Sequence, residues 1–409
     1  MALTASDVFQ HFAGQPHHVV RDYLFPSDDV QNVVNIAYIT QKAAVGSGNF
    51  ILPTLVDHLS PYFGALLANA VFTKWQFLIG NGVLGHEDPF PILELGPGLG
   101  ILMKDFLTQV LDMSKKSQEW NQFRKQIQYF TADISTPRIE KQKQLKNTMI
   151  QLGFTQDSIQ IHEFQLIADL PKILGSQKFW FILGNEFLNY LGKLRVLVKQ
   201  KQLLISGFIG YFPDEPLNSA FIKRHHLSAL PIQEKKQLKW LHMVVPSTFF
   251  SQSEHFFMTT PELTTFLTRQ IDGSTFFVDT TIARLIASLS PMTYPKGYIF
   301  FLDHMSPEKP EWELWSDPKL GNSVDMGQAV SQLGQYPLLG RIDKTTLKNV
   351  MKNHGFSLEI SGSQNLLEDQ FPLMETRVRL CQQIHAKYLN AFRNPATGME
   401  VLLFQKKNK

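Results

Sequence analysis

The sequence predicts an α/β protein built around an open, mostly parallel β-sheet. Three observations lead to this prediction. Short apolar runs bounded by turn residues alternate along the chain with segments of helical periodicity. The stretch ILELGPGLG, residues 92–100, joins one such run directly to a helical segment through three glycines. Hydrophobic residues make up 44% of the 409 residues, and the 32 phenylalanines indicate a bulky core.

The expected elements alternate between strand and helix. A helix over residues 55–80 precedes the sheet, an amphipathic helix covers 101–113, and a polar, lysine-rich helix covers 138–152. A later helix begins after Asp343 as its N-cap and ends at Gly355. The expected strands are residues 91–95, 127–133, 158–164, 178–187 and 297–304, followed by a terminal antiparallel pair at 355–360 and 399–405.

Two interruptions of the sheet predict the domain organisation. An inserted α+β cap, which contains an expected hairpin at 195–212, separates the two parts of the core, and a further insert lies near residues 305–337. The predicted parts are an N-terminal helical region at 1–80, the first part of the core at 81–189, the cap at 190–296 and the completion of the core at 297–409.

Composition excludes several classes of protein. The 39 basic and 36 acidic residues nearly balance, and no dense basic patch occurs, so nucleic acid is not an expected partner. The single cysteine, Cys381, cannot form an internal disulfide, which fits a reducing compartment. The N-terminus lacks the pattern of a secretion signal, and no apolar run is long enough to span a membrane. These features predict a bacterial cytoplasmic location, with the mitochondrial matrix as the alternative, and leave the oligomeric state open.

The glycine turn at residues 96–100 allows three interpretations as a ligand site. A phosphate-binding P-loop needs Gly-Lys-Ser/Thr, which is absent. A dinucleotide fingerprint needs G-x-G-x-x-G, and here the third glycine, Gly100, comes one residue early. The pattern E-x-G-x-G-x-G, typical of S-adenosylmethionine sites, fits fully with Glu94, Gly96, Gly98 and Gly100. A tight turn that holds no ligand remains the structural alternative.

Polar residues at other strand ends complete the predicted cofactor site. Ligands of open α/β sheets bind beyond the carboxyl ends of the strands. Asp133, at the end of the second strand, is expected to accept both ribose hydroxyls, although it could instead be a helix N-cap. Asp169 could flank the adenine or be a structural loop acid. Neither histidine spacing for a metal nor the G-x-S-x-G motif of a hydrolase occurs, so no metal is expected.

Several motifs in order resemble the MidA-like methyltransferase family, which includes the mitochondrial complex I assembly methyltransferase. The matching segments are SPYFG at 60–64, LELGPGLG at 93–100, DIS at 133–135, DLP at 169–171, NEF at 185–187 and FFLD at 300–303. The resemblance covers residues 45 to 405, roughly. It implies a class I (Rossmann-like) methyltransferase core with an inserted cap, S-adenosylmethionine as cofactor, Asn185 in the cofactor site, and a protein arginine side chain as substrate.

The chain departs from the family pattern on the substrate side. Asn189 stands where the family has an acid, Gly192 where it has a proline, and His304-Met305 where it has Tyr-Gly after the aspartate. The cofactor motifs are intact. Two alternatives therefore stay open at this point. One is a small-molecule methyltransferase with a pocket lined by the aromatic segment 247–258, and the other is a non-catalytic binding or assembly protein.

Two acids are the candidate catalytic residues. Methyl transfer needs an aligned nucleophile and the exclusion of water, and an arginine nucleophile needs carboxylates that hold its guanidinium. Glu186, at the end of the fourth strand, is the first candidate, and Asp303, at the end of the fifth, is the second. Each could alternatively have a structural role, such as the binding of backbone amides.

Overall fold

The computed structural model describes residues 59–164, 167–188, 193–200, 202–211, 239–246, 272–273, 275–279, 281–306, 342–362 and 399–408. They fall into two compact units. The larger lies within Ile51–Asn189, Arg284–Pro307 and Lys344–Lys409, and the strands of the smaller lie within Tyr190–Ala283. Three predicted features lie outside the described residues: residues 1–50 of the N-terminal helical region, most of the second insert near 305–337, and the aromatic segment 247–258. The predicted domain boundaries stay a prediction.

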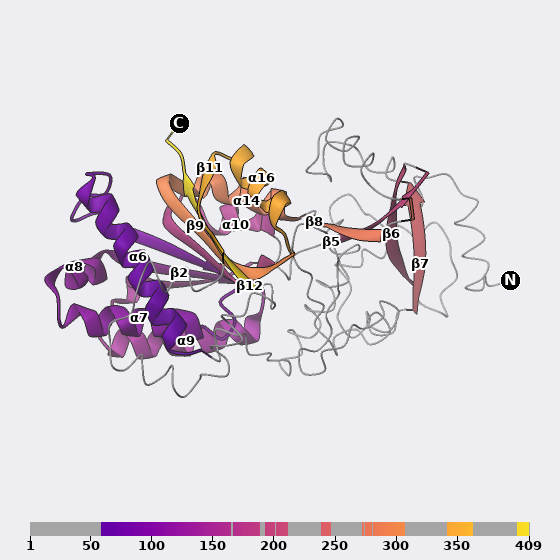
Figure 1. The fold of residues 1–409 in the computed structure, drawn as a ribbon. Coiled ribbons are helices and arrows are strands. Elements are labelled where there is room, and N and C mark those ends of the chain that lie inside the picture. The colour runs from indigo at the N-terminus through magenta and orange to yellow at the C-terminus, as the bar shows by residue number, and fades with distance from the viewer. Residues whose placement is uncertain are drawn as a thin grey trace. The chain divides into compact units, whose positions relative to one another are not determined.

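The larger unit is built on a mixed sheet (Figure 1). Its strands are β1 (Phe90–Leu95), β2 (Ile127–Asp133), β3 (Ile159–Glu163), β4 (Phe179–Asn185), β9 (Thr293–Ser306), β11 (Phe356–Gly362) and β12 (Met399–Lys406). They lie in the order β11-β12-β9-β4-β1-β2-β3, and a short eighth strand, β10 (Ile342–Asp343), pairs with β9. The five strands from β9 to β3 are parallel, and β12 runs antiparallel to both β9 and β11. The predicted mostly parallel sheet with a terminal antiparallel pair is therefore confirmed.

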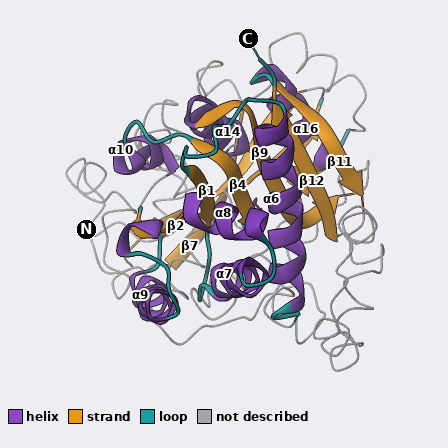
Figure 2. Ribbon diagram, turned by 90° about the vertical axis from the view of Figure 1, so that its left-hand side faces the viewer, coloured by secondary structure: helices purple, strands orange, loops and turns teal. Residues whose placement is uncertain are grey.

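Helices cover both faces of this sheet, as Figure 2 shows. On one side lie α6 (Tyr62–Gly80), α7 (Ile101–Ser114), α8 (Gln118–Gln126) and α9 (Thr136–Gln151). On the other side lie α10 (Leu170–Leu174), α14 (Thr281–Met292) and α16 (Lys344–Asn353). Short 3-10 turns, η1 (Gln156–Ser158) and η2 (Ile167–Asp169), flank β3. Each crossover helix joins two parallel strands, which is the connection that parallel pairing requires.

The core explains why these segments form these elements. All six residues of β1 are buried, as expected for a central parallel strand that is covered on both faces. Ile92 packs in the cluster formed with α6 and α7, whereas its neighbour Leu93 is buried outside that cluster. The apolar stripe of α7 includes Met103 and Phe106, neither of which has any exposed surface. Burial of each such side chain stabilises the fold by about 1.5–3 kcal/mol.

The SPYFG motif brings α6 unusually close to α7. A Cβ atom added to Gly64 would lie 2.4 Å from Cβ of Asp105, so only glycine permits this approach of the two helices. The Ser60 hydroxyl donates a hydrogen bond to the Asp105 carboxylate at the same place. Helix α7 begins directly after the glycine turn. Through these two contacts with Asp105, the SPYFG motif therefore holds the helix that follows the turn.

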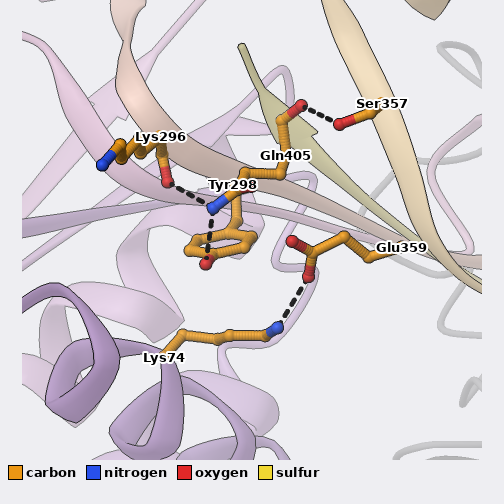
Figure 3. A network of polar contacts seen from close by, with 6 residues as sticks. All are labelled: Lys74, Lys296, Tyr298, Ser357, Glu359 and Gln405. Atoms are coloured by element: carbon orange, nitrogen blue, oxygen red, sulfur yellow. Dashed lines mark hydrogen bonds and ion pairs between the residues drawn. The ribbon is translucent and has the colours of Figure 1, made fainter. Parts of the chain in front are cut away.

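A polar network ties α6 to the antiparallel end of the sheet (Figure 3). Lys74 Nζ lies 2.6 Å from Glu359 Oε2 on β11 and 4.9 Å from the centre of the Tyr298 ring on β9. Gln405 Nε2 on β12 donates to the Tyr298 hydroxyl at 2.8 Å. Burial, followed by the charge of Glu359, raises the pKa of Tyr298, so this hydroxyl stays protonated. The network lies among β9, β11 and β12 and includes none of the predicted site residues.

The smaller unit contains a second, fully antiparallel sheet. Its strands are β5 (Lys193–Lys199), β6 (Gln202–Tyr211), β7 (Lys239–Pro246) and β8 (Thr275–Asp279), in the order β7-β6-β5-β8. Strands β5 and β6 form the hairpin expected at residues 195–212. All four strands lie between β4 and β9 in the sequence, so these strands are an insertion in the chain between two neighbouring strands of the larger sheet.

The structure corrects the expected bounds of two elements, α6 and β9, and adds two helices, α14 and α8. Helix α6 begins at Tyr62, after a turn, and not at residue 55. Helix α14 carries Pro291 near its end and leads directly into β9. Strand β9 begins at Thr293 and ends at Ser306, so Asp303 lies inside the strand and not at its last residue. The segment between β1 and β2 contains α8 in addition to α7.

Candidate functional site

The glycine turn joins β1 to α7 in a conformation that glycine alone adopts without strain. Gly96, Gly98 and Gly100 have φ angles of 62°, 57° and 78°. A Cβ atom on Gly96 would lie 2.7 Å from Cδ2 of Phe187, so the NEF segment packs directly against the turn. A Cβ atom on Gly98 would face open space, with Arg138 Nη1, at 4.0 Å, as its nearest neighbour. Gly98 is therefore the position where a ligand can approach the backbone.

Asp133 ends β2 beside this turn and is 3% exposed. Its Oδ2 accepts hydrogen bonds from Gly98 N at 3.1 Å and from Gln142 Nε2 at 3.2 Å, and its Oδ1 accepts one from Ser135 N at 3.1 Å. Burial raises the pKa of Asp133, an effect opposed mainly by the positive charge of Arg138. The carboxylate thus links β2 to the glycine turn. Its expected contact with ribose stays a prediction.

Glu94 lies under the same turn and is 2% exposed. Its Oε2 accepts a hydrogen bond from the Tyr129 hydroxyl at 3.0 Å, and the Tyr129 ring packs 5.4 Å from that of Phe106 on α7. Burial, followed by the charge and hydrogen bond of Glu94, raises the pKa of Tyr129. Glu94 therefore brings a buried acid to the α7 side of β1, directly before the turn, and its expected contact with the cofactor stays a prediction.

Two further residues predicted for the cofactor site stand at the carboxyl ends of β3 and β4. Asp169 ends η2 and precedes α10, and it is half-buried. Asn185 is the last residue of β4, next to β1. Within the described residues, Asn185 Oδ1 is buried and has no hydrogen-bond partner. The Ser135 hydroxyl, which follows β2 on the other side of β1, is buried and unpartnered in the same way.

The two candidate catalytic acids lie side by side. Glu186 is 8% exposed and has a φ of 45°, in the left-handed region that non-glycine residues rarely adopt. Its backbone N–H donates to Leu302 O at 2.7 Å, which places it beside Asp303 on β9. Asp303 has no exposed surface, and its oxygens accept from Leu188 N at 2.6 Å and His304 N at 2.8 Å.

The surroundings of Asp303 shift its titration strongly. Burial is the main cause that raises the pKa of Asp303 to about 7; the nearby charge of Glu186 acts in the same direction, while His304 and the N–H of Leu188 act against it. Asp303 therefore changes charge near neutral pH. The hydrogen bond from Leu188 N shows that Asp303 holds the backbone that follows Glu186, as the alternative of a structural role expects. The catalytic roles of both acids stay predictions.

The residues around the turn fit S-adenosylmethionine. The open side of Gly98 admits a ligand to the backbone, and unpartnered buried oxygens of Ser135 and Asn185 stand on either side of it. The carboxylates of Asp133 and Glu94 are acceptors for hydroxyl and ammonium groups, which the ribose and the amino-acid end of this cofactor carry. Fold and site together are those of one class of protein, an α/β enzyme that uses a nucleoside-containing cofactor, and the glycine turn after the first strand stays the predicted place where that cofactor binds.

Comparison with known proteins identifies the family. The model of a family described as "Putative S-adenosyl-L-methionine-dependent methyltransferase" matches residues 66–329, which is more than half of the chain. The chain belongs to this family and is an S-adenosylmethionine-dependent methyltransferase. The resemblance to a family of S-adenosylmethionine-dependent methyltransferases, inferred from the order of the motifs, is confirmed. No curated protein matches the sequence.

Solved structures support the fold. Two crystal structures of one protein superfamily from Burkholderia thailandensis resemble this chain, and each comparison covers 96% of this chain and 94% of the other. The native structure is 13% identical with a TM-score of 0.60, and the other, bound to S-adenosyl-homocysteine, is 12% identical with a TM-score of 0.61. The predicted class I methyltransferase fold is confirmed. The described residues contain no helix long and apolar enough to cross a membrane.

Sequence reasoning missed three residues of this site: Ser135, Gln142 and Phe187. Ser135 and Phe187 stand inside the quoted motifs DIS and NEF, so adjacency to Asp133 and Glu186 was the available signal. Gln142 lies in a polar, lysine-rich helix, where a glutamine reads as one more solvent-facing residue. Its complete burial has no local signal, because it depends on how α9 packs against the turn.

Proposed function

We propose that this methyltransferase acts on the guanidinium group of an arginine side chain in a protein. A guanidinium is a planar cation with five N–H donors, which two neighbouring carboxylates can hold and orient. In this site Glu186 is the acid that would hold the guanidinium, and the buried Asp303 stands beside it as a second acid. A neutral small-molecule acceptor would use a carboxylate only as a general base and would gain no charge pairing from two acids.

The backbone of Glu186 is the single observation that carries this proposal. A non-glycine residue at a φ of 45° costs of order 1–3 kcal/mol, and such strain clusters at functional sites. Phe187 follows and packs against Gly96 of the cofactor turn. The strained conformation therefore places an acid one residue from the group that contacts the turn, where an acceptor must meet the cofactor.

Each protein group has a distinct task in this mechanism. The bound cofactor supplies an electrophilic methyl group on a sulfonium sulfur. Glu186 binds guanidinium N–H groups, orients one nitrogen and accepts its proton. Asp303 acts through the backbone by fixing the N–H of Leu188, and it adds negative charge when it is ionised. Phe187 helps to exclude water from the turn.

The experiment compares radiolabelled methyl transfer to two peptides that differ only in having arginine or lysine at one position. The wild type is expected to label the arginine peptide. Glu186→Gln is expected to lose about 100-fold or more in kcat, because general-base catalysis contributes at least that much, and to keep its S-adenosylmethionine affinity. Glu140→Gln, on the exposed surface of α9, is the matched control and should behave as wild type.

Several results would contradict the proposal. Equal labelling of the lysine peptide would remove the guanidinium from the mechanism, and full activity of Glu186→Gln would remove the acid. Labelling of small molecules in a cell extract, with none of its proteins labelled, would support the small-molecule alternative. Cofactor binding without transfer to any acceptor would support a protein that has kept only its binding site.

A further inference from the structure

Gln142 is a buried polar residue at the centre of the cofactor site. It lies on α9 and has no exposed surface. Its Oε1 accepts a hydrogen bond from the Thr131 hydroxyl at 2.9 Å, and its Nε2 donates to Gly98 O at 2.8 Å and to Asp133 Oδ2 at 3.2 Å. Both N–H donors of the amide are therefore used, and the oxygen is paired as well.

These contacts allow only one orientation of the amide. The carbonyl of Gly98 and the carboxylate of Asp133 can only accept, so a flipped amide would point its oxygen at two acceptors, and the Thr131 hydroxyl would be a partner for only one of its N–H groups. Gly100 also restricts the side chain, because a Cβ atom there would lie 3.2 Å from Gln142 Cγ. The amide is thus held in place by both packing and hydrogen bonds.

The amide connects the two halves of the predicted cofactor site. One half is the glycine turn, which is held through the Gly98 carbonyl, and the other is Asp133, which is held through Oδ2. The Gly98 N–H donates to the same Oδ2 at 3.1 Å, so the three residues form a closed ring of hydrogen bonds. Thr131 anchors this ring to β2. Gln142 thus adds a link from a third element to the direct bonds between the two halves, which are Gly98 N–H to Asp133 and Gly96 N–H to Ala132 O.

We infer that Gln142 is a positioning residue for S-adenosylmethionine: it fixes the glycine turn relative to the Asp133 carboxylate so that both can contact the cofactor. It acts through these two partners and takes no part in the chemistry. Loss of its N–H groups should weaken cofactor binding about 10- to 100-fold, since each buried hydrogen bond to a charged group contributes that much. The methyl-transfer rate at saturating cofactor should change little.

The first test is calorimetric titration of the full chain with S-adenosylmethionine and with S-adenosyl-homocysteine. Gln142→Met keeps the approximate volume and removes both donors, so it should bind both ligands at least 10-fold more weakly. Gln144→Glu, at an exposed position two residues further along α9, is the matched control and should bind as wild type. A folded Gln142→Met whose affinity lies within twofold of wild type would overturn the inference.

The second test distinguishes positioning from mere packing and does not depend on whether Gln142→Met folds. Gln142→Glu places a second carboxyl group about where Nε2 now lies, 3.2 Å from Asp133 Oδ2, and two carboxylates so close cannot both be ionised. Arg138, the other charge that acts on Asp133, is present in wild type and variant alike. Because a shared proton restores one donor, the variant's dissociation constant, relative to wild type, should fall as the pH falls from 8 to 6.

A purely structural role predicts a different pattern. It would lower the thermal midpoint of the unliganded variants and leave the dissociation constant of the folded fraction unchanged at every pH. Thr131→Val provides a milder variant, because it removes only the donor to Gln142 Oε1, and it should weaken binding about threefold to fivefold. A pH-independent ratio for Gln142→Glu together with wild-type affinity for Thr131→Val would overturn the inference.

Discussion

At the scale of single residues, Asp303 shows how a carboxylate can serve the site without reaching solvent. Both of its oxygens accept backbone N–H groups, from Leu188 across the sheet and from the adjacent His304. The Leu188 N–H belongs to the segment that carries Glu186, so the charge state of Asp303 affects where that segment lies. Burial keeps the pKa of Asp303 at about 7, which makes its charge sensitive to ordinary changes of pH.

This pKa predicts the pH dependence of stability. The folded pKa of about 7 exceeds the unfolded value, so folded Asp303 binds more protons between about pH 4 and 7. Its contribution to stability is therefore full below about pH 4 and is lost as the pH rises to 7, by at most about 1.4 kcal/mol per pH unit. Urea unfolding of wild type and Asp303→Asn from pH 4 to 8 measures this, and the difference between them should fall with pH and level off above 7. A difference that does not change with pH would contradict the assignment.

At the scale of elements, the α6–α7 contact predicts an unequal response to two similar substitutions. Gly64→Ala puts a Cβ atom 2.4 Å from Asp105 Cβ, so the helices must separate, which typically costs 1–3 kcal/mol. Gly80→Ala, the last residue of the same helix, meets nothing within 4 Å and should be neutral or slightly stabilising. Guanidinium unfolding compares the two variants. Equal midpoints would show that α7 can shift freely and that the motif does not fix the turn.

The local elements of the fold were predictable because their signals are local. The spacing of apolar residues predicts strand β1 and helix α7, and the three glycines between them predict a turn with positive φ angles. Each of these patterns lies within about a dozen consecutive residues. The contacts that build the site are not local. Asp303 binds the backbone of a residue 115 positions earlier, and Gln142 reaches 44 positions back to Gly98. No pattern within either segment indicates these bonds, because they exist only when the strands have been ordered in the sheet.

At the scale of the whole molecule, the residues of the predicted site belong to one compact unit. The glycine turn, Asp133 and Glu186 come from the first of its segments, and Asp303 comes from the second. Between Glu186 and Asp303 in the sequence lie the four strands of the smaller unit. The chain therefore has to complete a long connection before β9 can pair with β4, and a ligand that binds the finished site stabilises that long-range pairing.

This linkage predicts that the cofactor product protects the whole unit against unfolding. S-adenosyl-homocysteine at 100 times its dissociation constant should add about 2.7 kcal/mol to the free energy of unfolding, which thermal denaturation detects as a rise in midpoint.

Gly98→Val should lose this rise, because its side chain fills the open side of the turn. Gly82→Val has the same backbone strain, with a φ of 65° at Gly82 and nothing within 4 Å of its added Cβ, and it lies outside the site. It should therefore have a lower midpoint without ligand but keep the full rise. A ligand-induced rise in Gly98→Val equal to that in Gly82→Val would mean that the cofactor binds elsewhere than at the glycine turn.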